Sequence, residues 1–181
     1  MKVDYNIFLI GFMGAGKSTI ARVLQRKLEM PLVEMDERIV EEQGMSINDI
    51  FAQYGEDHFR DVESQLILDL GKGEPSIISC GGGVVVRDRN TAYMKQSGRI
   101  VFLTATPKTV YERVKNSNDR PILNNHMNVE YIAELMEKRR ALYEAAADVT
   151  IATDDKTRDE ICDEILAYLQ EQKVEGWDGK R

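Results

Sequence analysis

Short apolar runs alternate along the chain with longer segments in which apolar residues recur every three or four positions. Residues 7–10 are continuously apolar, and Ile20, Val23, Leu24 and Leu28 behind them follow helical spacing. The first pattern is typical of a strand buried in a parallel sheet and the second of an amphipathic helix. Because the alternation continues through most of the chain, it predicts an α/β domain with a mainly parallel sheet of about five strands.

Further strands are expected at 31–36, 76–80, 99–103 and 148–152, and helices at 37–43, 46–54, 56–70, 87–96, 129–146, after Pro107 and after Thr157. Three of these helices have start signals. Ser46 and Thr157 are each followed three residues later by an acid, and Thr106 precedes a proline at the first helical position. Neither a repeat nor a linker interrupts the pattern. We therefore expect one domain over residues 1–172 and a polar tail over 173–181.

Composition narrows the class of protein. The 181 residues are 43% hydrophobic and 30% charged, and 31 acidic against 24 basic residues give a net charge of −7. An acidic balance argues against nucleic acid or an anionic membrane as partner, because both require a basic surface. Signal-peptide and membrane-span patterns are both missing, and Cys80 and Cys162 match no metal spacing. These features predict a cytoplasmic protein with reduced thiols. We also expect a monomer that acts on small molecules, although composition does not give the oligomeric state.

The segment Gly11–Thr19 fits the G-x-x-x-x-G-K-[ST] phosphate-binding pattern and lies between the first strand and the first helix. Glycines let successive N–H groups face one anion, and a helix that begins near Gly16 adds its positive dipole end. Lys17 is expected to reach the β- and γ-phosphates and Ser18 to offer its hydroxyl to Mg²⁺. The predicted ATP-binding residues of this loop are Gly14, Ala15, Gly16, Lys17, Ser18 and Thr19, of which Thr19 contacts the α-phosphate side or simply packs.

Two further groups are expected at the same edge of the sheet. Asp36 ends the second predicted strand, and the carboxyl ends of parallel strands face the ligand crevice. The alternative role for Asp36, alone or in addition, is to cap the helix that follows. Gly81, Gly82 and Gly83 come directly after a strand, where they allow close approach to a ligand and positive φ, or form a flexible turn.

Arginines stand in two informative places. Arg60 and Glu63 are three residues apart on one predicted helix, a spacing that alone indicates a solvated ion pair of little energetic value. Arg120 lies in the polar run 116–126, which reads as a mobile lid or as a flexible surface loop. Residue types alone do not decide between these alternatives.

Several motifs together resemble shikimate kinase: the phosphate loop, Phe59-Arg60 with Glu63, Gly81–Val85, Arg120–Leu123, and Arg139 followed by Leu142-Tyr143. The resemblance covers roughly residues 5–155. It implies a P-loop fold with strand order 2-3-1-4-5 and a lid at about 115–127. It also implies Mg²⁺- and ATP-dependent phosphorylation of the 3-hydroxyl of shikimate, in the pathway to aromatic amino acids.

The resemblance also implies roles for individual residues. Within a substrate region at about 36–63, Asp36 would hold the hydroxyls next to the phosphoryl acceptor. Arg60, steadied by Glu63, would grip the substrate carboxylate together with Arg139. The glycines Gly81, Gly82 and Gly83 would lie against the substrate ring. A planar guanidinium fork suits a carboxylate better than a lysine would.

On the nucleotide side, Arg120 would reach the transferring phosphates and Arg113 would lie beside the adenine. Glu34 stands where the family usually has aspartate and would contact Mg²⁺ through water. The catalytic set implied in this way is Lys17, Asp36 and Arg120.

Two other functions share the phosphate loop. One is a related small-molecule kinase for gluconate or a nucleoside monophosphate, which would not need Phe59-Arg60 and the three glycines together. The other is a catalytically silent nucleotide-binding regulatory protein on the same fold. That alternative is disfavoured by the presence of Lys17, Ser18, Asp36 and Arg120.

Overall fold

The computed structural model describes residues 2–115 and 128–174. Arg120 and nearly all of the predicted lid at 115–127 therefore lie outside the described residues, as does most of the tail expected at 173–181. Within the described residues, no helix is both long and apolar enough to cross a membrane.

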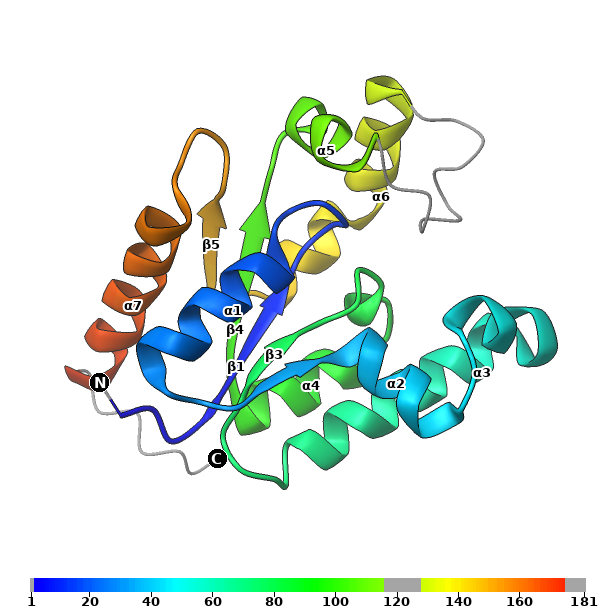
Figure 1. Cartoon of the computed structure of the whole chain (residues 1–181), viewed down its shortest axis with the longest axis horizontal. Helices are drawn as coiled ribbons and strands as arrows, with labels where there is room; N and C mark the ends of the chain where they lie inside the picture. Colours follow the sequence, from blue (N-terminus) through cyan, green and yellow to red (C-terminus); the bar gives the residue numbers. More distant parts are fainter. Residues whose placement is uncertain (1, 116–127, 175–181) are drawn as a thin grey trace.

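Five parallel strands form the sheet at the centre of the molecule (Figure 1). They are β1 (Asn6–Ile10), β2 (Leu32–Glu34), β3 (Ile77–Ser79), β4 (Gly98–Thr104) and β5 (Val149–Ala152). Their order is β2-β3-β1-β4-β5, and all four neighbouring pairs run parallel. The predicted fold class and strand order are thus confirmed.

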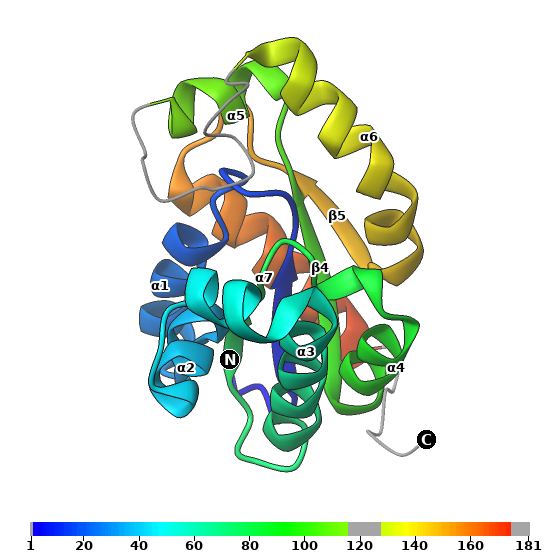
Figure 2. The same cartoon turned by 90° about the vertical axis from the view of Figure 1, so that its right-hand side faces the viewer.

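Helices cover both faces of this sheet (Figures 1 and 2). They are α1 (Lys17–Leu28), α2 (Met35–Gln43), α3 (Ile47–Leu70), α4 (Asp88–Ser97), α5 (Pro107–Val114), α6 (Val129–Ala146) and α7 (Arg158–Val174), with a short 3₁₀ turn η1 at Val84–Val86. The helix predicted at 129–146 is confirmed over its whole length.

The alternating side chains of β1 separate two hydrophobic cores. Ile7 and Leu9 pack with α1 and α7, whereas Phe8 and Ile10 pack with α2, α3 and α4. All four side chains are fully buried. A strand covered on both faces has no solvent side, which explains its uninterrupted apolar sequence.

The predicted helix starts are confirmed by their hydrogen bonds. Ser46 and Thr106 accept hydrogen bonds from the backbone N–H three residues ahead, and Thr157 and Glu160 bond reciprocally. The helices predicted at 46–54 and 56–70 run together as α3, with a break at Gly55, where φ is 82°. A left-handed φ interrupts a helix at little cost only at glycine.

The second strand is shorter than predicted. β2 ends at Glu34, whose extended backbone occupies the N-cap position, and α2 begins at Met35. Asp36 therefore lies in the first turn of a helix, so both the strand-end and the cap predictions for it are wrong. The positive end of the helix dipole favours acidic residues in this turn.

Candidate active site

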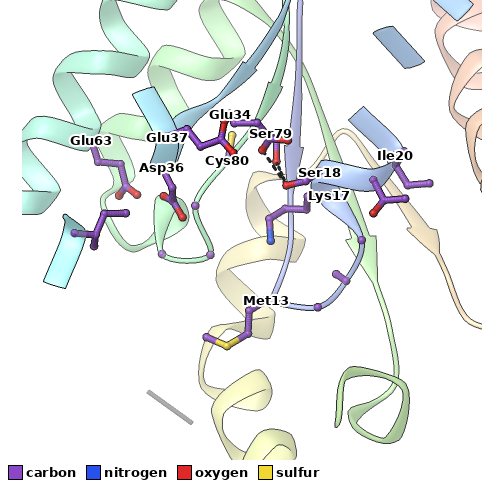
Figure 3. Close-up of a pocket in the computed structure, with 18 of the residues that line it drawn as sticks. Met13, Lys17, Ser18, Ile20, Glu34, Asp36, Glu37, Glu63, Ser79 and Cys80 are labelled. Atoms are coloured by element: carbon purple, nitrogen blue, oxygen red, sulfur yellow. Dashed lines mark hydrogen bonds between the residues drawn. The ribbon is translucent and has the colours of Figure 1, made fainter. Parts of the chain in front are cut away.

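A cavity of about 1070 Å³ opens at the carboxyl edge of the sheet. The loop after β1, the start of α2, the second half of α3 and the glycines after β3 line it, together with Arg113 from α5 and Arg139 from α6. Figure 3 shows Asp36 and Glu63 on one side of it and Lys17 and Ser18 on the other. Residues from elements far apart in the sequence thus face one space.

The phosphate loop has the backbone geometry that its glycines permit. Gly11, Gly14 and Gly16 have φ values of 145°, 76° and 101°, and Gly16 occupies the N-cap of α1 without a side-chain cap. Because glycine has no side chain with which to cap the helix, the amide groups at this helix start can bind an anion. Lys17 Nζ donates hydrogen bonds to the carbonyl oxygens of Gly11 at 2.7 Å and Phe12 at 3.1 Å.

The side-chain oxygens of Ser18, Glu34 and Ser79 lie close together near Lys17 (Figure 3). Ser18 Oγ donates to Glu34 Oε2 at 2.9 Å and lies 3.3 Å from Ser79 Oγ. Glu34 Oε1 is buried and finds no hydrogen-bond partner among residues 2–115 and 128–174, and Arg22 Nη2 lies 4.0 Å away as its ion-pair contact. A carboxylate and hydroxyls are ligands that Mg²⁺ prefers, so these residues fit that ion.

Arg60 is held by two carboxylates. Its Nη1 donates to Glu63 Oε1 at 3.0 Å, and its Nε and Nη2 donate to Glu56 Oε1 at 3.3 and 3.2 Å. The side chains of Arg60 and Glu63 are only 8% and 1% exposed. The prediction of a solvated ion pair, which rested on this spacing alone, is therefore wrong. Burial raises the pKa of Glu63 to about 7, although Arg60 opposes the shift.

Gly81 and Gly83 are required for space and not for a left-handed backbone, whereas a Cβ at Gly82 would meet only ordinary contacts of 3.8 Å or more. None of the three glycines has positive φ, so that part of the prediction is wrong. A Cβ at Gly83 would lie 2.3 Å from both terminal nitrogens of Arg60, and one at Gly81 would lie 2.9 Å from Asp36 Oδ1. Only residues without a side chain let these charged groups approach the backbone so closely.

Arg139 is the arginine of the 139–140 pair that faces the cavity, as its spacing to Leu142-Tyr143 suggests. Its Nη1 donates to the Gly82 carbonyl oxygen at 3.2 Å, and the Tyr143 hydroxyl donates to the same oxygen. Arg140 instead pairs with Glu137 on the surface. Arg60 and Arg139 thus lie against consecutive glycines.

On the opposite side of the cavity, Arg113 joins three segments. Its Nη1 donates to the Gly14 carbonyl oxygen at 3.0 Å and to Thr153 Oγ1 at 3.1 Å. The Thr153 hydroxyl in turn lies 2.9 Å from the Thr104 carbonyl oxygen, to which it donates. These bonds tie the phosphate loop to α5 and to the residues after β5.

Sequence reasoning missed Glu56, Tyr143 and Thr153 as parts of this site. Glu56 precedes Arg60 by one helical turn, a spacing that could have marked it. Tyr143 has a sequence signal only as part of the Leu142-Tyr143 motif, and its contact with Gly82 spans 61 positions. No local pattern signals the contacts of Thr153, which is 40 positions from Arg113.

Comparison with known proteins adds a family. A family model described as Shikimate kinase matches residues 13–170. A shikimate kinase of Dehalococcoides mccartyi is 42% identical over 170 residues, which cover 94% of this chain and 96% of the relative. The solved structure of a shikimate kinase from Acinetobacter baumannii in complex with shikimate matches with a TM-score of 0.88 at 28% identity, over 96% of this chain and 97% of that one.

A gluconokinase from Sinorhizobium meliloti 1021 is more distant. It has a TM-score of 0.62 at 19% identity, over 95% of both chains. This likeness shows the shared fold alone.

Proposed function

The chain belongs to the shikimate kinase family, and we propose that it transfers the γ-phosphoryl group of ATP to the 3-hydroxyl of shikimate. The observation that carries this proposal is the pair of guanidinium groups, Arg60 and Arg139, at consecutive glycines in the cavity that also contains the phosphate loop. A site of this kind suits an acceptor with one carboxylate and several hydroxyls.

The acceptor is held at both ends. Arg60 and Arg139 bind its carboxylate, while Asp36 accepts hydrogen bonds from its hydroxyls and orients the attacking oxygen. The proximity of Asp36 to Gly81 supports this arrangement, because it leaves no side chain between the carboxylate and the ring. Phosphoryl transfer depends on positioning and charge neutralisation, so Asp36 acts first as an orienting group.

The nucleotide phosphates bind at the start of α1. The backbone N–H groups from Gly14 to Thr19 surround them, and Lys17 exchanges its bonds to loop carbonyl oxygens for bonds to the β- and γ-phosphates. Ser18 and Glu34 would hold Mg²⁺, which when bound neutralises charge on the transferring phosphates. Arg113 lies beside the adenine, and Arg120, outside the described residues, contributes a further positive charge to the phosphates.

Two remaining proposals concern setting. Cys80 and Cys162 are free, buried thiols, which favours a reducing compartment such as the cytoplasm. We expect the protein to act as a monomer on small molecules.

The experiment that tests the function compares two arginine-to-lysine variants in a coupled assay for ADP. Arg60→Lys keeps the charge but loses the fork, so the KM for shikimate should rise about tenfold or more while the KM for ATP stays within about twofold. Arg87→Lys is the control, because Arg87 pairs with Asp57, whose side chain is 98% exposed. An unchanged KM for shikimate in Arg60→Lys would contradict the proposal that Arg60 binds the substrate carboxylate.

A further inference from the structure

Glu63 is the most enclosed carboxyl group at the acceptor end of the cavity. One of its oxygens accepts the hydrogen bond from Arg60. The other lies 3.1 Å from the Cβ position of Gly81, and Asp36 Oδ1 lies 2.9 Å from that same point. Because both distances are measured to one point, the two carboxylate oxygens are at most about 6 Å apart. Figure 3 shows the two side chains approaching each other from α3 and α2.

The charges that face Glu63 come from every element packed around it. Arg60 on its own helix and Arg139 on α6 are positive, and Asp36 on α2 is negative. Tyr143 on α6 and Cys80 after β3 also face it, but burial raises the pKa of both, so each is neutral near pH 7. Glu56 adds a second negative charge through Arg60. Three carboxylates thus already surround two guanidinium groups before the acceptor binds.

An arriving carboxylate makes four acidic groups around two arginines. Like charges in buried surroundings repel strongly, and the repulsion is relieved when one of the acids binds a proton. Glu56 is hydrated because its side chain is 60% exposed. Asp36 is also exposed and lies in the first turn of α2, where the helix dipole favours a negative charge. Glu63, 1% exposed, is the group whose neutral form the site favours most.

We propose that Glu63 takes up a proton from solvent when the acceptor's carboxylate binds to Arg60, so that protonation of Glu63 and binding of the acceptor favour each other. The neutral carboxyl still accepts the Arg60 hydrogen bond through its carbonyl oxygen. Glu63 is in this way a positioning residue that adjusts the net charge around Arg60 and Arg139. The inference rests on the proposed function, because it requires an acceptor with a carboxylate.

A linked proton gives a definite pH dependence. In the free protein the pKa of Glu63 is about 7, and bound carboxylate raises it further. Below that pH the proton is already present and acceptor affinity is independent of pH. Above it, the dissociation constant should rise by up to about tenfold per pH unit, because each binding event must then recruit a proton.

The test is calorimetric titration of the intact protein with shikimate, without nucleotide, in buffers that differ in ionisation enthalpy. At about pH 7.5 we expect uptake of about half a proton or more per site. Glu63→Gln mimics the neutral carboxyl, so it should bind shikimate without proton uptake and without the rise in dissociation constant. Glu56→Gln removes the exposed carboxylate on the same arginine and should retain the uptake.

Each outcome has one meaning. Binding of shikimate to the wild-type protein with equal heats in all buffers would overturn this inference and leave the proposed function standing. Proton uptake that persists in Glu63→Gln would assign the proton to another group and also overturn it. If Glu63→Gln does not fold, the wild-type and Glu56→Gln titrations still decide, together with the protonated-carboxyl C=O stretch in the infrared difference spectrum on binding. Absence of any binding would remove the proposed function and the inference together.

Discussion

Gly83→Ala is the substitution whose effect follows most directly from the geometry. The new Cβ would lie 2.3 Å from Arg60 Nη1 and Nη2 and 2.5 Å from its Cζ. The backbone of Gly83, with φ of −98°, accommodates alanine without strain. The three nearest atoms thus all belong to one guanidinium group, which must move by about 1 Å to reach an ordinary contact distance of 3.4 Å.

That movement weakens binding of the substrate carboxylate more than it destabilises the fold. Arg60 is buried and bonded to Glu63 and Glu56, so displacement weakens charge-assisted hydrogen bonds worth about 1.5–3 kcal/mol each. If one such bond to the substrate carboxylate is lost, kcat/KM for shikimate falls roughly 10- to 150-fold. A misplacement of about 1 Å can have an effect of this size on catalysis.

The assay is steady-state ADP release with shikimate and ATP varied separately, alongside thermal unfolding. We expect the loss in kcat/KM for shikimate and a KM for ATP within about twofold of wild type, because the phosphate loop is not touched. Gly73→Ala is the matched control, since its Cβ would come no closer than 3.6 Å to any atom. Wild-type kinetics and an unchanged unfolding temperature in Gly83→Ala would refute the packing of Arg60 on Gly83.

Arg139→Ala should raise the KM for shikimate about tenfold or more, because Arg139 faces the cavity. Arg140→Ala loses only a surface ion pair with Glu137 and should change this KM less than about twofold. Equal effects of the two substitutions would contradict the inward placement of Arg139. Ser18→Ala should raise the Mg²⁺ concentration for half-maximal activity severalfold with little change in the shikimate KM, and an unchanged Mg²⁺ titration would exclude Ser18 as a ligand. Burial raises the pKa of Glu63 in the folded protein to about 7 from its ordinary value of 4.5, so its stabilising contribution is complete below about pH 4.5 and is lost as the pH rises through 7. Urea unfolding should show the wild type losing about 3 kcal/mol relative to Glu63→Gln over that window, and parallel pH profiles would argue against the raised pKa.

Most of the fold was predictable because its elements carry strong local signals. The buried strand at 7–10, the caps at Ser46 and Thr106 and the helix at 129–146 all depend on periodicity and start signals within a few residues. The error at Asp36 has a local cause as well. Strand and helix meet between Glu34 and Met35 without a turn, and one apolar residue between two acids reads equally well as either.

The residues that form the site were predictable, but their burial and their contacts with one another were less so. Chain patterns and the family resemblance named Arg60, Glu63 and the glycines, yet helical spacing alone indicated a solvated pair. Burial of that pair depends on Gly81 and Gly83, which are about 20 positions away in sequence and adjacent in space. Long-range contacts of this kind, like those of Thr153, leave no periodic trace in a single sequence.

The central claim is that the protein phosphorylates shikimate in this cavity. The most direct test measures acceptor-dependent ADP release by the purified protein. With Mg-ATP and separate samples of shikimate, quinate, gluconate and a nucleoside monophosphate, we predict rapid ADP release with shikimate and a product phosphorylated on the 3-hydroxyl. Faster release with gluconate or the nucleotide, or no acceptor-dependent release at all, would contradict the account.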